Sequence, residues 1–251
     1  MIEILILSLI QGITEFLPIS SSSHLIIASE YLKLEKNLSI DVSLHIGSFL
    51  AVLVYFYKDV LNFYENKVLF LKIIISSIPV MLIGIILFET NLIEKIRNIE
   101  TIAWATLIFG ILLFISDKCK IEKTITENFS LKSAIFIGLF QVLALIPGVS
   151  RSGIAITAAR FLKFKRVDAA KISFLISIPI LGAVSFLGLK NILFSESQYI
   201  ARLNIFAIIF AFFFSIVTIK YFLKYLNKFS LNIFFYYRFL LGIILLIVAY
   251  L

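Results

Sequence analysis

The chain is poor in cysteine, in charged residues and in polar linker sequences. Its single cysteine, Cys119, excludes an internal disulfide. Only 15% of its 251 residues are charged, and no Gly-, Ser- or Pro-rich linker or polar stretch of domain size interrupts it. The opening residues MIEILILSLIQG hold an acid in place of a basic n-region and lack a small-residue cleavage site, so we expect no removable signal peptide. We predict one domain, residues 1–251.

Apolar residues are abundant instead. They make up 61% of the chain, and the mean hydropathy is +1.07, whereas a soluble domain is about half apolar. Long apolar runs recur from end to end with little strict alternation, which predicts an all-α, multi-span integral membrane protein. We attribute the net charge of +8 to lysines in cytoplasmic loops, and we expect no nucleic-acid partner.

Six segments approach the length of about 20 apolar residues that a membrane crossing requires. They are residues 42–57, 69–88, 102–116, 172–189, 204–223 and 233–250. The third is short, so we expect it to need a locally thinner bilayer or a protein neighbour.

Two further apolar regions are each broken by a polar tip. Residues 2–13 are followed by TEFLPISSSSH before LIIASEYL resumes, and residues 131–146 are followed by PGVSRSG before IAITAARFL. Each half is too short to cross alone, and proline and glycine favour a break at each tip. We predict two re-entrant helix–loop–helix hairpins. Their tips should lie inside the bundle, because non-helical backbone at membrane depth needs protein or water around it.

Charge sets the predicted orientation. If neither hairpin crosses the membrane, 14 basic residues fall on one side and 6 on the other. The richer side comprises loops 58–68, 117–132, 163–171 and 224–232, together with the flanking residues Lys220 and Arg238. By the positive-inside rule these basic loops are cytoplasmic, and both termini lie on the outer face.

The two broken regions resemble each other. Gln11, Pro18 and Ser20 to Ser22 in the first correspond to Gln141, Pro147, Ser150, Arg151 and Ser152 in the second, and SSIPVMLIG (76–84) resembles LISIPILGA (175–183). Since the hairpins enter from opposite sides, we predict an inverted repeat with halves of roughly 1–116 and 117–251. Such proteins place their site where the broken helices meet near the midplane.

The second tip has the composition of an anion site. Arg151 lies far from either end of its apolar surroundings, and an intramembrane arginine indicates function unless it is paired. Its guanidinium suits phosphate or carboxylate. Gly148 and Gly153 allow close approach of the backbone, while Ser150 and Ser152 add hydroxyl donors before a helix N-terminus. The structural alternative is an Arg–Glu pair that locks the two hairpins together, with the serines as helix caps.

The first tip supplies complementary groups. Glu15 is a carboxylate at membrane depth, and Gln11 lies one helical turn earlier on the same face. One hydroxyl of the run 20–23 could be a nucleophile, and His24 could be a base, an acid or a nucleophile.

The plainer alternative for these serines is helix capping. Ser22 and Ser23 fit that role well before LIIASEYL. Likewise, His45 is interpreted as packing or pocket-lining, and Trp104 as an interfacial anchor.

Together the tips predict an anion site that is also suited to phosphoryl transfer. Glu15, with Gln11, could hold Mg²⁺ or Ca²⁺ against phosphate groups, since these ions need few protein carboxylates. The same residue types fit both a phosphatase and an anion transporter.

At these residues the sequence resembles a known family, the undecaprenyl-diphosphate phosphatases or bacitracin-resistance proteins. The resemblance rests on QGITEFLPISSSSHL (11–25) and PGVSRSG (147–153), and it extends to DVSLHIGSFLAVLVYF (41–56), FLISIPILGA (174–183) and FYYRFLLG (235–242). It implies a bacterial inner-membrane enzyme that hydrolyses undecaprenyl diphosphate to undecaprenyl phosphate and inorganic phosphate. The product is reused in cell-wall synthesis, and the activity confers bacitracin resistance. A homodimer is implied by the resemblance alone.

The family motifs also imply site residues. The catalytic set is Ser21, His24, Glu15 and Arg151, and the phosphate-binding set is Ser20, Gly148, Ser150, Arg151, Ser152 and Gly153. The family usually has threonine where this chain has Ala155, and the nearest threonine is Thr157.

The predicted mechanism has Ser21 attack the terminal phosphorus while His24 and Glu15 manage its proton, with His24 as the alternative nucleophile. The alternative function is a flippase for a lipid phosphate or a transporter of another anion.

Overall fold

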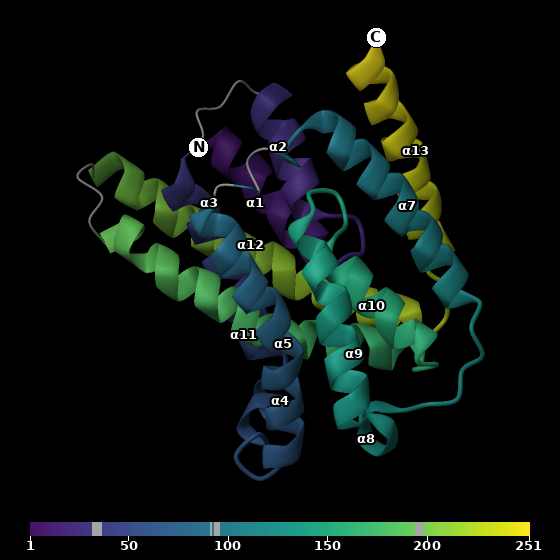
Figure 1. Ribbon diagram of the computed structural model, residues 1–251. Coiled ribbons are helices and arrows are strands. Elements are labelled where there is room, and N and C mark those ends of the chain that lie inside the picture. The colour runs from purple at the N-terminus through teal and green to yellow at the C-terminus, as the bar shows by residue number, and fades with distance from the viewer. Residues whose placement is uncertain (32–36, 91, 93–95, 194–197) are drawn as a thin grey trace.

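The computed structural model describes residues 1–31, 37–90, 92, 96–193 and 198–251. Regular structure in these ranges is helical (Figure 1). The elements are α1 (Ile2–Thr14), α2 (Ser21–Tyr31), α3 (Leu38–Tyr55), α4 (Tyr57–Leu61), α5 (Lys67–Glu89), α7 (Ile99–Asp117), α8 (Ile125–Asn128), α9 (Leu131–Val142), the 3₁₀ turn η1 (Leu143–Leu145), α10 (Arg151–Phe161), α11 (Arg166–Leu193), α12 (Gln198–Leu226) and α13 (Asn232–Tyr250).

Six of these helices are long and apolar enough to cross a membrane, namely α3, α5, α7, α11, α12 and α13. Each carries one of the six predicted segments, so the all-α prediction with six spans is confirmed. The third segment is longer than predicted, because the Asn98 side chain accepts a hydrogen bond from the Thr101 amide and caps α7 three residues earlier. Its 19 residues need no special thinning of the bilayer.

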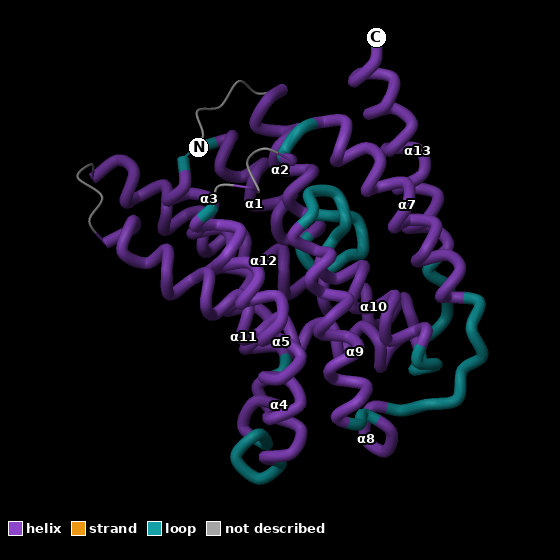
Figure 2. Tube along the Cα trace, in the orientation of Figure 1, coloured by secondary structure: helices purple, strands orange, loops and turns teal. Residues whose placement is uncertain are grey.

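Both predicted breaks are present. Helix α1 ends at Thr14 and α2 begins at Ser21, while η1 ends at Leu145 and α10 begins at Arg151. Figure 2 shows both breaks as loops in the middle of the molecule, between the end with the termini and the end with α4 and α8. The hydroxyl of Ser152 donates to the carbonyl of Leu17 at 2.8 Å, so the two tips touch. That the hairpins are re-entrant stays a prediction.

Arg238 on α13 holds the two tips together, and the position predicted for it from the sequence was wrong. It was expected to flank a cytoplasmic loop, yet its side chain is fully buried. Its guanidinium donates to five backbone carbonyls, those of Pro18, Ala105, Thr106, Gly148 and Val149, at 3.0–3.4 Å. Broken helices leave carbonyls without partners inside an apolar bundle, and Arg238 satisfies those of both tips at once.

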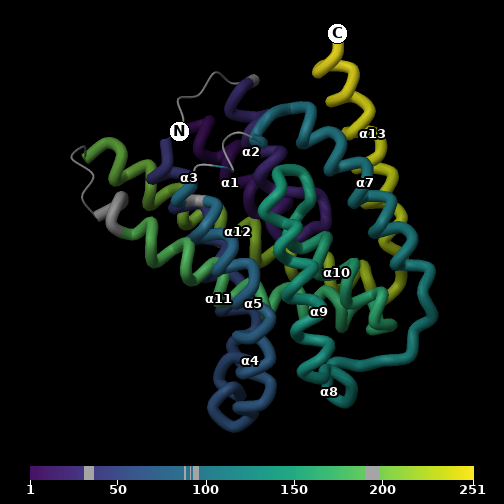
Figure 3. Tube along the Cα trace, viewed as in Figure 1, coloured from purple at the N-terminus to yellow at the C-terminus, as the bar shows by residue number. Residues whose placement is uncertain are grey.

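The two halves share features beyond sequence. Ser20 and Ser150 both have positive φ, 73° and 72°, and Pro79 and Pro179 lie inside α5 and α11. Helix α1 packs on α12, and α9, its counterpart in the second half, packs on α5. Helix α3 packs on α11, and α7 packs on α13, so each of these pairs joins a helix of one half to a helix of the other. In Figure 3 the purple and yellow ends of the chain lie at the same end of the molecule. These pairings agree with the inverted repeat, which stays a prediction together with its two halves and its orientation.

Candidate active site

Glu15 is the centre of a buried polar cluster built from both tips. Its Oε1 accepts a hydrogen bond from Arg151 Nη2 at 2.7 Å. Its Oε2 accepts from Ser21 Oγ at 2.7 Å and from Gln11 Nε2 at 3.1 Å. These side chains come from α1, the first residue of α2 and the first residue of α10. The predicted meeting of the two tips, and the shared face of Gln11 and Glu15, are confirmed.

The charge of Glu15 is set by its neighbours. The carboxyl lies outside the six spanning helices, in the break after α1. Burial alone would raise its pKa, but Arg151 and His45, with hydrogen bonds from Arg151 and Ser21, hold the pKa below its ordinary value. The group is therefore an ionised carboxylate paired with a guanidinium that is itself only 13% exposed.

Arg151 has one donor group left over. Its Nη1 is buried and makes no hydrogen bond to any residue that the structure describes. A buried cationic donor without a partner is costly, which suggests that it meets an anionic ligand.

Local backbone geometry fixes Arg151 in place. Ser150 caps α10 by accepting a hydrogen bond from the Gly153 amide at 3.1 Å, so Arg151 opens the helix. Gly148 has φ +99°, and a Cβ there would lie 2.6 Å from the carbonyl oxygen of Ile102. Only glycine fits this position.

The remaining tip serines are engaged with protein groups. Ser152 binds the Leu17 carbonyl, and its hydroxyl lies 3.2 Å from that of Ser150. The Ser20 hydroxyl lies 2.9 Å from that of Ser23. Of the three predicted phosphate-binding serines, Ser152 joins the two tips, whereas Ser20 and Ser150 contact groups of their own tips. A contact of these serines with phosphate stays a prediction.

The expected cap of α2 is two or three positions too late. Ser22 and Ser23 were predicted to precede the helix, but α2 already begins at Ser21. The cap position falls on Ser20, whose left-handed backbone makes the sharp turn out of the tip. Ser21 is thereby free to point its hydroxyl at Glu15.

His24 lies beside α13, away from the carboxylate. Its Nδ1 is 2.7 Å from the carbonyl oxygen of Ser20, and its Nε2 is 2.6 Å from the hydroxyl of Tyr237. The two rings also stack, with centroids 5.7 Å apart. Both ring nitrogens are thus engaged outside the Glu15 cluster, and Tyr237 is a neighbour that sequence reasoning missed. The only sequence feature that pointed to Tyr237 was its position within FYYRFLLG (235–242).

His45 is the histidine that reaches the carboxylate. Its Nδ1 lies 3.0 Å from Gln11 Nε2 and 4.0 Å from Glu15 Oε2. It also lines a cavity of about 900 Å³ shared with Ser22 and Asp41, so the pocket-lining interpretation is confirmed. Its closeness to Glu15 was missed, because α3 carries it there from about 30 residues downstream and no local pattern indicates it.

A divalent cation fits part of this donor set. The Oε1 atom of Gln11 is buried and unbonded among the described residues, and it belongs to the same side chain that contacts Glu15. The described part of the chain contains no group of three or more His, Cys, Asp or Glu side chains that could hold a metal. Mg²⁺ or Ca²⁺ held here would have one carboxylate and one amide oxygen, with water and phosphate oxygens as its other ligands.

The family's threonine is not replaced by a neighbour. Ala155 is fully buried in the core. Thr157 is also buried, and its hydroxyl donates to the carbonyl of Gly153 in its own helix at 2.8 Å. Thr157 therefore does not take over the position of the missing hydroxyl.

Known proteins are similar to this chain over almost its whole length. The family described as bacitracin resistance protein BacA matches residues 4–244. An undecaprenyl-diphosphatase of Pelagibacter ubique (strain HTCC1062) is 49% identical over 251 residues, covering 99% of this chain and 98% of the relative. Two further undecaprenyl-diphosphatases are also similar. That of Saccharophagus degradans is 42% identical and covers 94% of this chain and 93% of the relative. That of Jannaschia sp. strain CCS1 is 37% identical and covers 98% of this chain and 97% of the relative.

Proposed function

Since the chain belongs to the bacitracin resistance protein BacA family, we propose that it hydrolyses undecaprenyl diphosphate to undecaprenyl phosphate and inorganic phosphate. It is a multi-pass protein of the bacterial inner membrane. Its product is the lipid carrier of cell-wall synthesis, and its activity confers bacitracin resistance. The observation that carries the proposal is the buried, unbonded Nη1 of Arg151 beside an ionised carboxylate and a serine hydroxyl.

Binding begins with Arg151. The terminal phosphate accepts hydrogen bonds from its guanidinium, whose planar donors suit phosphate oxygens. Phosphate then competes with Glu15 for the same cation. As the pairing with Glu15 weakens, the carboxylate becomes a stronger base at the moment when substrate arrives.

The reaction follows from the contact between Ser21 and Glu15. The carboxylate takes the proton of the Ser21 hydroxyl, with which it already shares a 2.7 Å hydrogen bond. The serine oxygen forms a bond to the terminal phosphorus, the bridging P–O bond breaks, and the lipid monophosphate leaves. Water then attacks the phosphoserine, which releases inorganic phosphate and restores Ser21. Arg151 stabilises the charge on the transferring group.

Two further groups assist. Mg²⁺ or Ca²⁺, held by Glu15 and Gln11, would neutralise phosphate charge. His24, bound to Tyr237, orders the Ser20 turn from which Ser21 projects. The lipid headgroup enters through the cavity that His45 lines, with its tail between apolar helices. The re-entrant hairpins, the outward-facing termini and a homodimer belong to the same proposal.

Phosphate release by purified protein in detergent tests this function, because no gradient exists there. Wild type should release phosphate from the lipid diphosphate. Ser21→Ala should lose about 10³-fold or more. Ser29→Ala, which changes a serine that lines the same cavity without contacting Glu15, is the matched control and should keep wild-type activity. Release by neither wild type nor the control would favour the transporter.

A further inference from the structure

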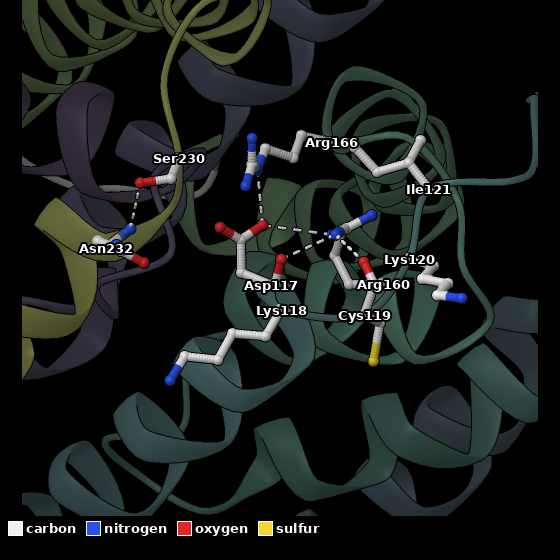
Figure 4. Close-up of a pocket in the computed structure, with 9 residues that line it drawn as sticks. All are labelled: Asp117, Lys118, Cys119, Lys120, Ile121, Arg160, Arg166, Ser230 and Asn232. Carbon is white, nitrogen blue, oxygen red and sulfur yellow. Dashed lines mark hydrogen bonds and ion pairs between the residues drawn. The ribbon is translucent and has the colours of Figure 1, made fainter.

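A second cavity lies at the far end of α10 from the Glu15 cluster. Its volume is about 520 Å³. Figure 4 shows its lining residues, which are Asp117, Lys118, Cys119, Lys120, Ile121, Arg160, Arg166, Ser230 and Asn232. Arg151 opens α10 and Arg160 lies nine residues later, which is about 14 Å along a helix axis. The cavity is thus separate from the phosphatase site.

The floor of this cavity is a network of charged side chains joined by hydrogen bonds and ion pairs. Arg160 is fully buried, and its Nη2 donates to the carbonyls of Asp117 and Cys119, both at 2.9 Å. The Asp117 carboxylate accepts from Arg166 Nε at 2.7 Å and from the Leu231 amide at 3.0 Å. In Figure 4 both arginines converge on this one carboxylate. The floor is held by α7, α10 and α11 together.

The cavity carries an excess of positive charge. Four of its lining side chains are cationic, namely Lys118, Lys120, Arg160 and Arg166, and one, Asp117, is anionic. The Arg166 side chain is 27% exposed beyond its contact with Asp117. Ser230 and Asn232 add a hydroxyl and an amide on the opposite wall. Basic side chains with neutral donors beside them are the groups that bind a phosphate ester.

The cavity also lies where the spanning helices end. The span of α7 ends at Asp117, that of α11 begins at Arg166 and that of α13 begins at Asn232. Ile108, Ile111 and Ile115 on α7 are 50%, 42% and 49% exposed. Their spacing places them on the same helix face as Lys118, three residues further on. A basic cavity at the membrane boundary therefore continues into an exposed apolar stripe.

We propose that this cavity binds the phosphate of an anionic phospholipid, with an acyl chain along the α7 stripe. Basic pockets between helices on the cytoplasmic side, where the charge bias places this end, are suited to such headgroups. Inorganic phosphate shares the headgroup chemistry but has no apolar part to use the stripe. The lipid bridges α7, α11 and α13 at one end of the bundle and so braces the C-terminal end of α10.

Lipid binding to the detergent-solubilised protein tests the proposal by native mass spectrometry. The probes are dioctanoyl phosphatidylglycerol, dioctanoyl phosphatidylcholine and inorganic phosphate. Wild type should retain the phosphatidylglycerol in preference to the other two. The double variant Lys118→Gln/Lys120→Gln, which spares the Asp117 network, should bind it about 30-fold more weakly, or about fivefold for each lysine.

The matched control is Lys224→Gln/Lys228→Gln, which removes two exposed lysines from the same side of the protein but outside the cavity. It should bind like wild type. Equal binding by both double variants would overturn the proposal, as would equal retention of phosphatidylcholine. Lysine-dependent binding of inorganic phosphate without phosphatidylglycerol would overturn the lipid assignment. Lys118→Gln/Lys120→Gln should hydrolyse lipid diphosphate at the wild-type rate, so failure here is distinguishable from failure of the phosphatase.

Discussion

The pair formed by Glu15 and Arg151 gives the sharpest test of how the two tips form one site. The atoms are 2.7 Å apart, and the side chains are only 5% and 13% exposed. Removing one partner of such a buried pair leaves an uncompensated charge and costs about 3–5 kcal/mol. We therefore expect Glu15→Gln and Arg151→Gln each to destabilise the protein, and the double variant to recover most of the loss.

The expected shifts are measurable. For a chain of this size 1 kcal/mol corresponds to about 2–4 °C in Tm, so each single variant should unfold at least about 6–12 °C below wild type in detergent. The double variant, which carries a neutral pair, should lie within about 1 kcal/mol of wild type. In the two single variants and in the double variant, phosphate release should be lower than in wild type by about 10²-fold or more, because the charged groups that act on the transferring phosphate are removed.

An exposed ion pair provides the control. Lys163 and Glu122 lie 3.2 Å apart with both side chains 47% exposed, so Glu122→Gln should cost under about 1 kcal/mol. A double variant no more stable than the worse single one would show that the loss does not come from an unpaired buried charge. Full activity in the double variant would refute the role of the pair in catalysis.

Three further predictions test other parts of the structure. Gly148→Ala should destabilise by about 1–3 kcal/mol in thermal unfolding because of its positive φ, whereas Gly84→Ala, whose Cβ would meet one atom at 3.5 Å, should be neutral or stabilising. His45→Ala should lower phosphate release, because His45 contacts Gln11 and helps to keep the pKa of Glu15 low, and unchanged release would exclude a contribution of His45 to the Glu15 cluster. A membrane-impermeant maleimide should label Cys119 in inverted vesicles and not in intact cells, and the opposite pattern would reverse the orientation.

Much of the fold follows from the sequence, because membrane helices have a strong local signal. Each of the six spans was visible as an apolar run, and the breaks at Pro18 and Pro147 were visible as polar interruptions. The residues at which helices begin and end were harder to predict. Asn98 extends α7 by a cap, which is a single side-chain contact that hydropathy cannot register.

The site was predicted in part. Gln11, Glu15, Ser21 and Arg151 form one cluster, as the inverted pairing of the two tips suggested. Long-range partners were not predictable. Arg238, the seventh residue of α13, was counted among the residues that flank a cytoplasmic loop, yet it is buried in the core, where it binds carbonyls of both tips.

Histidine placement shows the same limit. His24 follows the serine run directly in sequence, but the first turn of α2 rotates it toward Tyr237. His45 lies far away in sequence, but α3 packs against α12 and presents it to Gln11. Nearness along a chain does not set nearness in a helical bundle.

In the proposed mechanism Ser21, activated by Glu15, attacks a phosphorus held by Arg151. Rapid quenching of the enzyme with lipid diphosphate that is radiolabelled at its terminal phosphate tests it most directly. We expect transient protein-bound label that survives acid and maps to the peptide containing Ser21, and no label in Ser21→Ala. Acid-labile label on His24, or phosphate release with no protein-bound label at any time, would contradict it.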